Sequence, residues 1–325
     1  MTRASQQVRE KFEIRKTKKQ KQAFRDWLCQ TLEREGFDVR VEHHKGIFAS
    51  DNVVVGDPEQ ARLLLTAHYD TCATLPFPNF ITPRNLFWYL LYQLLIVVFF
   101  FAAVFVMSFL ASTLTLFLID DTTVVVLISM VVSYAFMVFL LWWMFDGKAN
   151  RHNANDNTSG VTVLLETALS LSQEQRGKVC FVFFDNEERG MLGSAAFAKA
   201  HKRAKEEVPV LNFDCVGDGD SIQFFPGKRV KKTELPQLLE QAFEGNSKKT
   251  VEVVKGFGFY PSDQVVFHHG VGVCALKHNK VLGYYMDRIH TGGDKILDEA
   301  NVRLLRRGVN QLLRLLTDKE EVHAK

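Results

Sequence analysis

The chain has 325 residues, of which 47% are apolar, and its formal net charge is only +3. That length and apolar content supply a core for one large domain or two ordinary ones. Its lysines and arginines are spread along the sequence and form no basic face, so nucleic acid is not an expected partner. The five cysteines contain no CxxC pair, which argues against a zinc knuckle and favours a reducing compartment.

The N-terminal segment is strongly basic. Its first 25 residues hold nine Lys or Arg against two acids, and we expect one basic helix within residues 1–35. Such a helix is either a solvated face or a segment attracted to anionic lipid, at about 1 kcal/mol per basic residue near the surface. It lacks an apolar core of its own, so no secretory signal peptide is expected.

Residues 85–145 are predicted to form a hairpin of two membrane-spanning helices. No charged residue lies between Arg84 and Asp120, and a second uncharged run follows from Thr122 to Phe145. The first run exceeds the roughly 20 apolar residues that a spanning helix needs. The alternative, a pair of buried core helices, fits poorly because uncharged runs of this length are rare inside soluble domains.

Charges around the hairpin predict its orientation. Arg84, Lys148 and Arg151 flank its base, whereas only Asp120 and Asp121 lie at its tip. The positive-inside rule therefore places both soluble portions in the cytoplasm. The expected protein is an integral membrane protein with two spans, and residues 1–84 and 146–325 together form its one domain outside the membrane.

The soluble sequence alternates compact apolar runs with helical patterns. This alternation predicts an α/β sandwich, in which helices flank a mixed, mostly parallel central sheet. The expected strands are 62–66, 179–184, 208–213 and 271–275, and the expected helices are 161–171, 192–200 and 295–316.

Polar side chains follow three of these strands directly. His68 and Asp70 come after the first, Glu187 and Glu188 after the second, and Asp214 after the third. Ligands of open α/β sheets gather at the carboxyl ends of strands, so these groups are expected to converge. Each group alone is weak evidence.

Two further candidates lie beside helix starts. Asp156 belongs to a polar loop before the helix at 161, where an ordinary capping role is the alternative. His290 precedes the last helix, and a lone histidine there is usually structural. Ser159 lies in no GxSxG elbow and reads as a cap, not a nucleophile.

As an ordered set, these segments resemble the co-catalytic zinc aminopeptidases, a family that also includes glutaminyl cyclases and transferrin-receptor-like proteins. The resemblance covers most of the chain outside the hairpin and the basic N-terminus. The motifs that carry it are His68-Tyr-Asp70, Asn155-Asp156-Asn-Thr-Ser-Gly160, Phe184-Asp-Asn-Glu187-Glu188-Arg-Gly190, Asn212-Phe-Asp214 and Ile289-His290-Thr291.

The resemblance implies a role for each motif residue. His68 and Asp214 would bind one zinc ion, Glu188 and His290 the other, and Asp156 would bridge both. Asp70 would orient the His68 ring, and Glu187 would be the general base toward a metal-bridging water.

These roles imply a peptidase that hydrolyses N-terminal residues of peptides. Two imidazoles and three carboxylates suit two Zn²⁺ ions, with Co²⁺ or Mn²⁺ as possible substitutes, and leave positions open for water and substrate.

The sequence departs from the family pattern at several positions. Asp263 matches a loop beside the substrate cleft, but Gln264 stands where relatives commonly have His, which puts a substrate-binding role of Asp263 in doubt. Asn153 replaces a usual Gly, and Asp218 and Asp220 add unusual charge after the Asp214 motif.

Two rival functions remain open at this stage. A glutaminyl-cyclase-like transferase would use similar residues around one zinc ion, and a transferrin-receptor-like scaffold would be non-catalytic.

Only ten positions separate Asp146 from Asp156, and ten residues reach at most about 36 Å, so the metal centre should lie close to the membrane. The hairpin would then be a simple tether or would also govern substrate access. The sequence does not indicate the preferred N-terminal residue, the physiological substrate or the oligomeric state.

Overall fold

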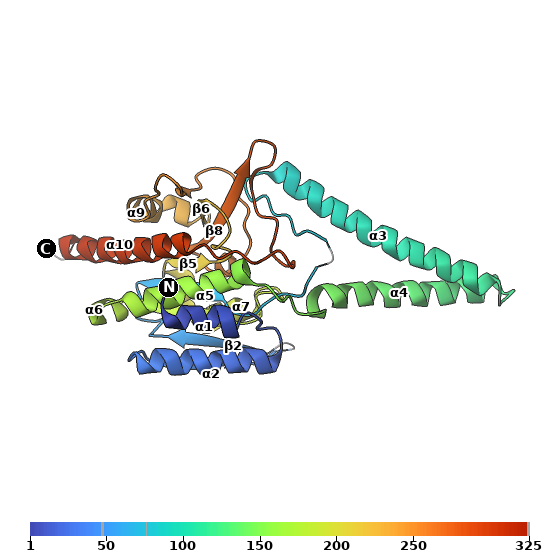
Figure 1. Cartoon of the computed structure of the whole chain (residues 1–325), viewed down its shortest axis with the longest axis horizontal. Helices are drawn as coiled ribbons and strands as arrows, with labels where there is room; N and C mark the ends of the chain where they lie inside the picture. The colour runs from blue at the N-terminus through green and yellow to red at the C-terminus, as the bar shows by residue number, and fades with distance from the viewer. Residues whose placement is uncertain (47–48, 76, 324–325) are drawn as a thin grey trace.

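The computed structural model describes residues 1–46, 49–75 and 77–323. Within these residues, nine strands form one mixed sheet of order β1-β2-β4-β3-β5-β8-β6-β7, with β9 paired to β8 (Figure 1). The strands are β1 (Val39–His44), β2 (Ser50–Val55), β3 (Leu63–His68), β4 (Val179–Phe184), β5 (Val210–Phe213), β6 (Ser221–Pro226), β7 (Thr250–Val253), β8 (Gly270–Asn279) and β9 (Gly283–Tyr285).

Helices cover both faces of this sheet. The α-helices are α1 (Arg3–Lys11), α2 (Lys18–Arg34), α3 (Leu86–Leu116), α4 (Thr122–Asp146), α5 (Gly160–Ser170), α6 (Gln173–Arg176), α7 (Leu192–Ala200), α8 (Lys202–Glu206), α9 (Leu235–Ala242) and α10 (Glu299–His323). Short helices of other types are η1 (Ala154–Ser159), η2 (Val230–Lys232) and η3 (Asp263–Val266).

The centre of the sheet is parallel. Strands β4, β3, β5 and β8 run side by side in one direction, and β1, β2 and β6 add antiparallel pairings at the flanks. Every residue of β3, β4 and β5 is buried, as expected of parallel strands covered on both faces. Apolar side chains of α1, α2, α5 and α10 fill the core on one face, and those of α7 and α8 lie on the other. The predicted α/β fold is confirmed.

The N-terminal segment differs from its prediction, because it forms two helices instead of one. Helix α1 ends at Lys11, and α2 begins after Thr17, whose side chain and that of Gln20 make a reciprocal capping box. Between the helices, the fully buried Arg15 donates its Nε–H to the Tyr69 carbonyl. The predicted single helix is therefore interrupted because Thr17 caps a new helix and because Arg15 is buried between the two helices.

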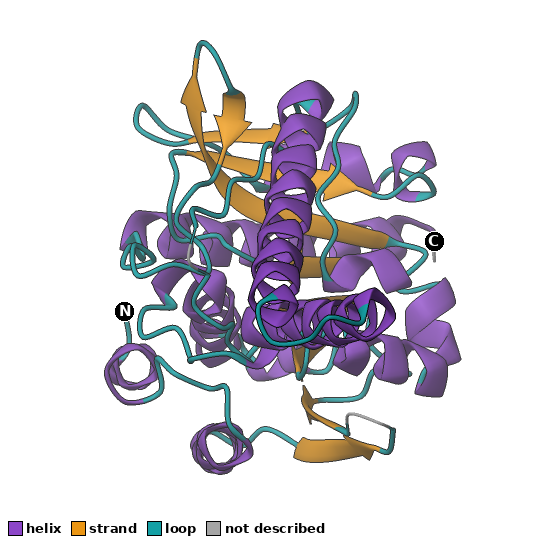
Figure 2. Ribbon diagram, turned by 90° about the vertical axis from the view of Figure 1, so that its right-hand side faces the viewer, coloured by secondary structure: helices purple, strands orange, loops and turns teal. Residues whose placement is uncertain are grey.

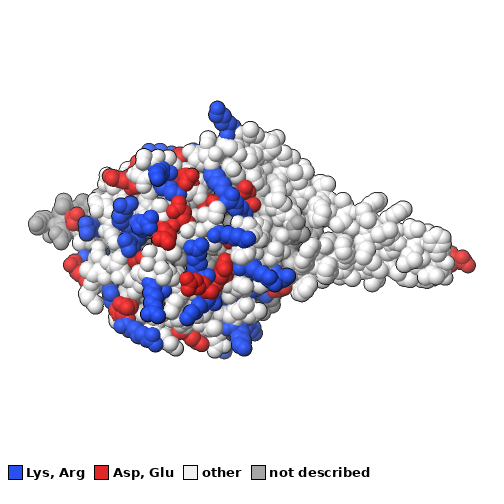
Figure 3. Space-filling model, viewed as in Figure 1, with Lys and Arg blue, Asp and Glu red and all other residues white. Residues whose placement is uncertain are grey.

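Helices α3 and α4 form the expected hairpin, which projects from the catalytic body (Figures 1 and 2). Both are long and apolar enough to cross a membrane, with 31 and 25 residues. None of the most apolar stretch of α3 is buried, and 17% of that of α4 is, so these are not core helices. The hairpin surface in Figure 3 is uncharged except for acidic atoms at its tip, whereas charges of both signs cover the body.

Candidate active site

The predicted metal ligands meet at the carboxyl edge of the parallel strands, around Asp156. Its Oδ1 lies 3.2 Å from His68 Nε2, and its Oδ2 lies 3.0 Å from His290 Nε2. Asp214 Oδ1 lies 3.4 Å from the same His68 nitrogen, and Glu188 Oε2 lies 3.3 Å from the His290 nitrogen. The five side chains thus form two groups that share one carboxylate.

The donor set fits divalent cations. Glu188 Oε1 is buried without a hydrogen-bond partner among the described residues, and such an atom is costly unless a ligand satisfies it. Burial lowers the pKa of His68, but the carboxylates of Asp156, Asp214 and Asp70 outweigh it and hold that pKa well above its usual value. Buried imidazoles and carboxylates are the donors that zinc takes.

The surroundings of His290 and Glu188 repeat this electrostatic pattern. Burial lowers the pKa of His290, but Glu188 and Asp156 raise it to about 9. Burial raises the pKa of Glu188 to about 8 against the opposing effect of His290. A cation bound here would offset the cost of burying these carboxyl groups and favour their charged forms.

Asp70 lies behind the site and holds the loop after β4. Its carboxylate accepts the backbone N–H of Glu187 at 3.0 Å and that of Glu188 at 3.3 Å. The His68 ring is closer to the Asp70 backbone oxygen (3.1 Å) than to its carboxylate (3.6 Å). Orientation of His68 by the Asp70 carboxylate therefore stays a prediction, while its contacts with the Glu187–Glu188 backbone were not foreseen.

Glu187 lies among several other acids. Burial raises its pKa well above the usual value, His68 opposes that shift, and Asp263 and Asp214 reinforce it. Asp263 itself is fully buried, and neither of its carboxylate oxygens has a hydrogen-bond partner among the described residues. Burial raises the Asp263 pKa to about 7. Its predicted contact with substrate remains a prediction.

Two residues important to the site were missed by the sequence reasoning. Asp294 is 1% exposed and accepts the backbone N–H groups of Asn155 (2.7 Å) and Asp156 (3.0 Å), so it fixes the bridging loop. Arg15 is fully buried and donates to Thr158 at 3.2 Å, two residues after Asp156. Neither belongs to a local pattern. The one available signal was the position of Asp294, four residues after His290.

The departures from the family pattern have structural partners. Gln264 Oε1 accepts from the side chain of Asn212, two residues before Asp214, at 3.1 Å. Asn153 Nδ2 donates to the Glu13 carbonyl at 3.0 Å and so ties the N-terminal segment to the site. The added acid Asp218 pairs with Lys277 at 3.1 Å, and Asp220 pairs with Lys249 at 2.6 Å.

A cavity of about 630 Å³ reaches from one predicted metal ligand, Glu188, to the base of the hairpin. Asp70 and Glu188 line it on one side, and Phe145 and Asp146 of α4 line it on another. Lys16 also lines it and donates to the Phe145 carbonyl at 2.6 Å. The candidate site is therefore adjacent to the end of the second apolar helix.

The chain is similar to known proteins in sequence pattern and in fold. The model of peptidase family M28 matches residues 144–313, just over half of the chain. The match begins at the end of the hairpin and includes Asp156, Glu187, Glu188, Asp214 and His290. No curated protein sequence matches the chain.

Several solved structures share the fold. The LapA aminopeptidase of Legionella pneumophila is 17% identical, with 96% of this chain and 68% of that chain covered at a TM-score of 0.55. The glutaminyl cyclase of Porphyromonas gingivalis is 17% identical, with 96% and 97% covered at a TM-score of 0.58. A leucine aminopeptidase precursor from Bacteroides thetaiotaomicron is 15% identical, with 95% of each chain covered at a TM-score of 0.58. At these identities the likeness concerns the fold. The family match carries the assignment: the chain belongs to peptidase family M28 and is a zinc metallopeptidase.

Proposed function

We propose that the protein is a membrane-anchored aminopeptidase that holds two zinc ions and removes N-terminal residues from peptides. One observation supports this most directly: the two oxygens of Asp156 face two different histidines, at 3.2 and 3.0 Å. A carboxylate placed in this way would bridge two cations. His68 and Asp214 would complete the site of one ion, and Glu188 and His290 that of the other.

Glu187 is proposed as the general base. Zinc, when bound, would polarise the scissile carbonyl and acidify the attacking water. Glu187 would accept the proton of that water and deliver it to the leaving amine. Asp70 would hold Glu187 and Glu188 in their different directions through its bonds to the two backbone N–H groups. Asp294 would position Asp156 through the bonds to the loop backbone.

Hydrolysis of amino-acid anilides by the full-length protein in detergent tests this proposal. We expect zinc- or cobalt-dependent release of the N-terminal residue, with Glu187→Gln lowering kcat by at least about a hundredfold. This variant should retain its metal, because Glu187 is not a proposed ligand. Glu206→Gln, at the end of α8, is the matched surface control. Equal turnover by Glu187→Gln and the wild type would refute the assigned base.

The rival activity is cyclisation of an N-terminal glutamine around a single zinc ion. A glutaminyl cyclase is among the proteins of similar fold. Elemental analysis distinguishes the two activities, since two ions per chain support the peptidase and one supports the cyclase. A glutaminyl peptide substrate adds a second readout, because hydrolysis releases glutamine and cyclisation releases ammonia. A scaffold without activity would show neither product.

The hairpin is proposed to span the bilayer, with the catalytic domain in the cytoplasm. A helix of 25 residues extends about 38 Å, longer than the hydrocarbon core of about 30 Å. The cavity that joins Glu188 to Phe145 supports a role of the hairpin in access as well as in anchoring. Substrates would then be short peptides or N-termini presented near the membrane. Unchanged preference across peptides of different hydrophobicity, between detergent and lipid nanodiscs, would favour a simple tether.

A further inference from the structure

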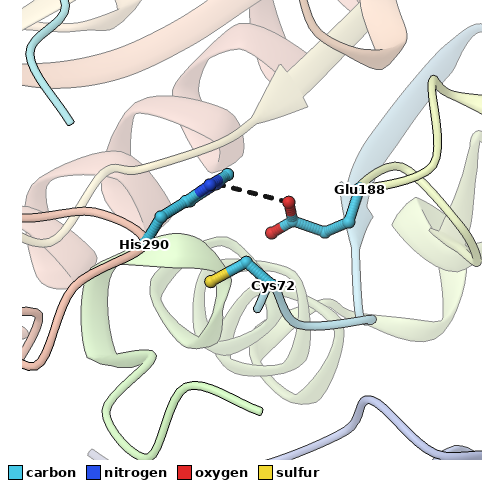
Figure 4. Close-up of side chains that lie close together, drawn as sticks. All are labelled: Cys72, Glu188 and His290. Carbon is cyan, nitrogen blue, oxygen red and sulfur yellow. Dashed lines mark ion pairs between the residues drawn. The ribbon is translucent and has the colours of Figure 1, made fainter. Parts of the chain in front are cut away.

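A cysteine lies beside the second group of ligands. Cys72, which follows Asp70 by two residues, is 2% exposed. Its sulfur, a carboxylate oxygen of Glu188 and a ring nitrogen of His290 all lie within 4.8 Å of one another. Figure 4 shows the thiol below the pair formed by these two residues. The sequence reasoning assigned no role to Cys72.

The backbone holds this thiol in place. The Cys72 carbonyl accepts the Asn150 N–H at 3.1 Å, on the chain that leaves the hairpin. Three residues later, the Leu75 N–H donates to the His290 carbonyl at 2.8 Å. The segment that carries Cys72 is therefore tied to the segment that carries His290. Because both anchors are backbone bonds, the backbone of Cys72 is held near His290 independently of its side-chain partner.

The separations suit a cation. Tetrahedral zinc with bonds of about 2.0–2.3 Å places its ligand atoms about 3.3–3.8 Å apart. The contact between His290 Nε2 and Glu188 Oε2, 3.3 Å, already has this value, and the sulfur, within 4.8 Å of both partners, would move closer to them on binding an ion. The other oxygen of Glu188 is buried without a hydrogen-bond partner among the described residues. The cluster thus offers three atoms that can bind a metal ion, and it leaves one carboxylate oxygen of Glu188 without a hydrogen bond.

We infer that Cys72 is a ligand of the ion held by Glu188 and His290. The inference rests on the proposed two-zinc site. It makes the ligand sets of the two ions chemically different. One ion would have His68, Asp156 and Asp214, and the other would have the softer set of Cys72, Glu188, His290 and Asp156. A thiolate favours zinc, cadmium and other thiophilic ions over manganese, so the second ion is held more tightly and more selectively.

Ligation requires loss of the thiol proton. Cys72 Sγ–H now donates to Asn153 Oδ1 at 3.5 Å, an ordinary distance for a weak sulfur donor. On binding, the S–H bond breaks, its electron pair forms the bond to the ion and the proton leaves to solvent. Asn153 remains fixed without that contact, because its Nδ2 donates to the carbonyls of Glu13 at 3.0 Å and Asn150 at 2.9 Å.

Cobalt-substituted full-length protein in detergent tests the inference through its absorption spectrum. Sulfur bound to Co²⁺ gives an intense charge-transfer band in the near ultraviolet, which nitrogen and oxygen ligands do not give. We expect this band in the wild type and its loss in Cys72→Ser. Cys215→Ser is the matched control, because Cys215 is also buried and donates to the ligand Asp214 at 3.2 Å. A band that survives Cys72→Ser, or that disappears only in Cys215→Ser, would overturn the inference.

Metal retention gives a second readout. In Cys72→Ser, the affinity of the second ion should fall by about tenfold or more in competition with a chelator. Cadmium NMR of the wild type needs no variant and protects the test against misfolding of Cys72→Ser. One resonance shifted strongly downfield by sulfur and one without sulfur are expected, and two resonances without sulfur would exclude Cys72. A protein that binds no ion at all would refute the proposed function itself.

Discussion

Asp146, the last residue of the second apolar helix, forms an ion pair with Arg189, the residue directly after Glu188. A proposed metal ligand is thereby joined, through one neighbouring side chain, to the base of the hairpin. Lys16 reinforces this junction, because its ammonium group donates to the Phe145 carbonyl at 2.6 Å. A change in the tilt of α4 would therefore move the loop that carries Glu187 and Glu188.

Asp146→Asn tests this connection. The two side chains are 36% and 32% exposed, and pairs of that kind contribute about 1 kcal/mol or less, so the variant should stay folded with little change in Tm. We expect a several-fold weaker retention of metal and a lower kcat in nanodiscs. Glu174→Gln, which removes a surface pair with Lys178, is the control. If both variants match the wild type, the ion pair is only a surface contact.

The shared position of Asp156 predicts an unequal loss of metal. Asp156→Ala should lose both ions, because it removes one donor from each group. Asp214→Ala should lose only the ion near His68, since Asp214 contacts that histidine alone. Elemental analysis after gel filtration measures the difference, with Asp220→Asn, which is 84% exposed, as the control. Loss of the same number of ions in Asp156→Ala and Asp214→Ala would contradict the bridging role.

The parallel strands at the centre of the sheet were predictable from the sequence, while the buried strands β2 and β6, the sheet edges and the long-range partners were not. The expected bounds of β4 (Val179–Phe184) and α7 (Leu192–Ala200) agree with the structure, because continuous apolar runs and helical spacing are local signals. β1 was missed, since it lies at the sheet edge and carries charged residues. In the sequence, Arg15 looks like any other basic residue of the N-terminal segment. Its burial depends on Tyr69 and Thr158, which are 54 and 143 positions away.

Arg15→Met should destabilise the protein strongly. The guanidinium is fully buried and donates to the carbonyls of Tyr69 and Phe12 and to the Thr158 hydroxyl. Burial lowers its pKa to about 10, so it remains charged. Its removal leaves these acceptors without a donor and should cost about 3 kcal/mol. Thermal unfolding in detergent measures the effect.

Arg9→Met, on the exposed side of α1, is the control and should change stability by less than about 0.5 kcal/mol. An equal Tm in both variants would rule out a structural role of Arg15.

His201 predicts a pH-dependent stability away from the metal site. Its Nε2 lies 3.0 Å from Glu42, and its Nδ1 lies 3.0 Å from Glu59. The bond to Glu42 raises the His201 pKa above 6.5. The folded state therefore binds a proton more tightly than the unfolded chain, so the stabilisation is complete below pH 6.5 and is lost as pH rises through the folded-state pKa.

The Tm difference between wild type and His201→Gln should thus be largest below pH 6.5 and shrink as the pH rises above it. In a Glu42→Gln background the pH dependence should weaken, because the main partner is gone. A difference that grows with pH would contradict the assigned direction of the shift.

The proposed topology predicts that the hairpin tip and the catalytic domain lie on opposite sides of the membrane. Asp121 caps α4 by accepting the Thr123 N–H at 2.8 Å, so the exposed Asp120 is the better position for a cysteine label. Of the native cysteines, Cys29 is partly exposed and the other four are buried, which keeps the background low. In intact cells, a membrane-impermeant maleimide should label Asp120→Cys but label Lys228→Cys, an exposed site on the catalytic domain, only after lysis. The reverse pattern would invert the orientation, and recovery of the protein in the soluble fraction without detergent would refute insertion of the hairpin.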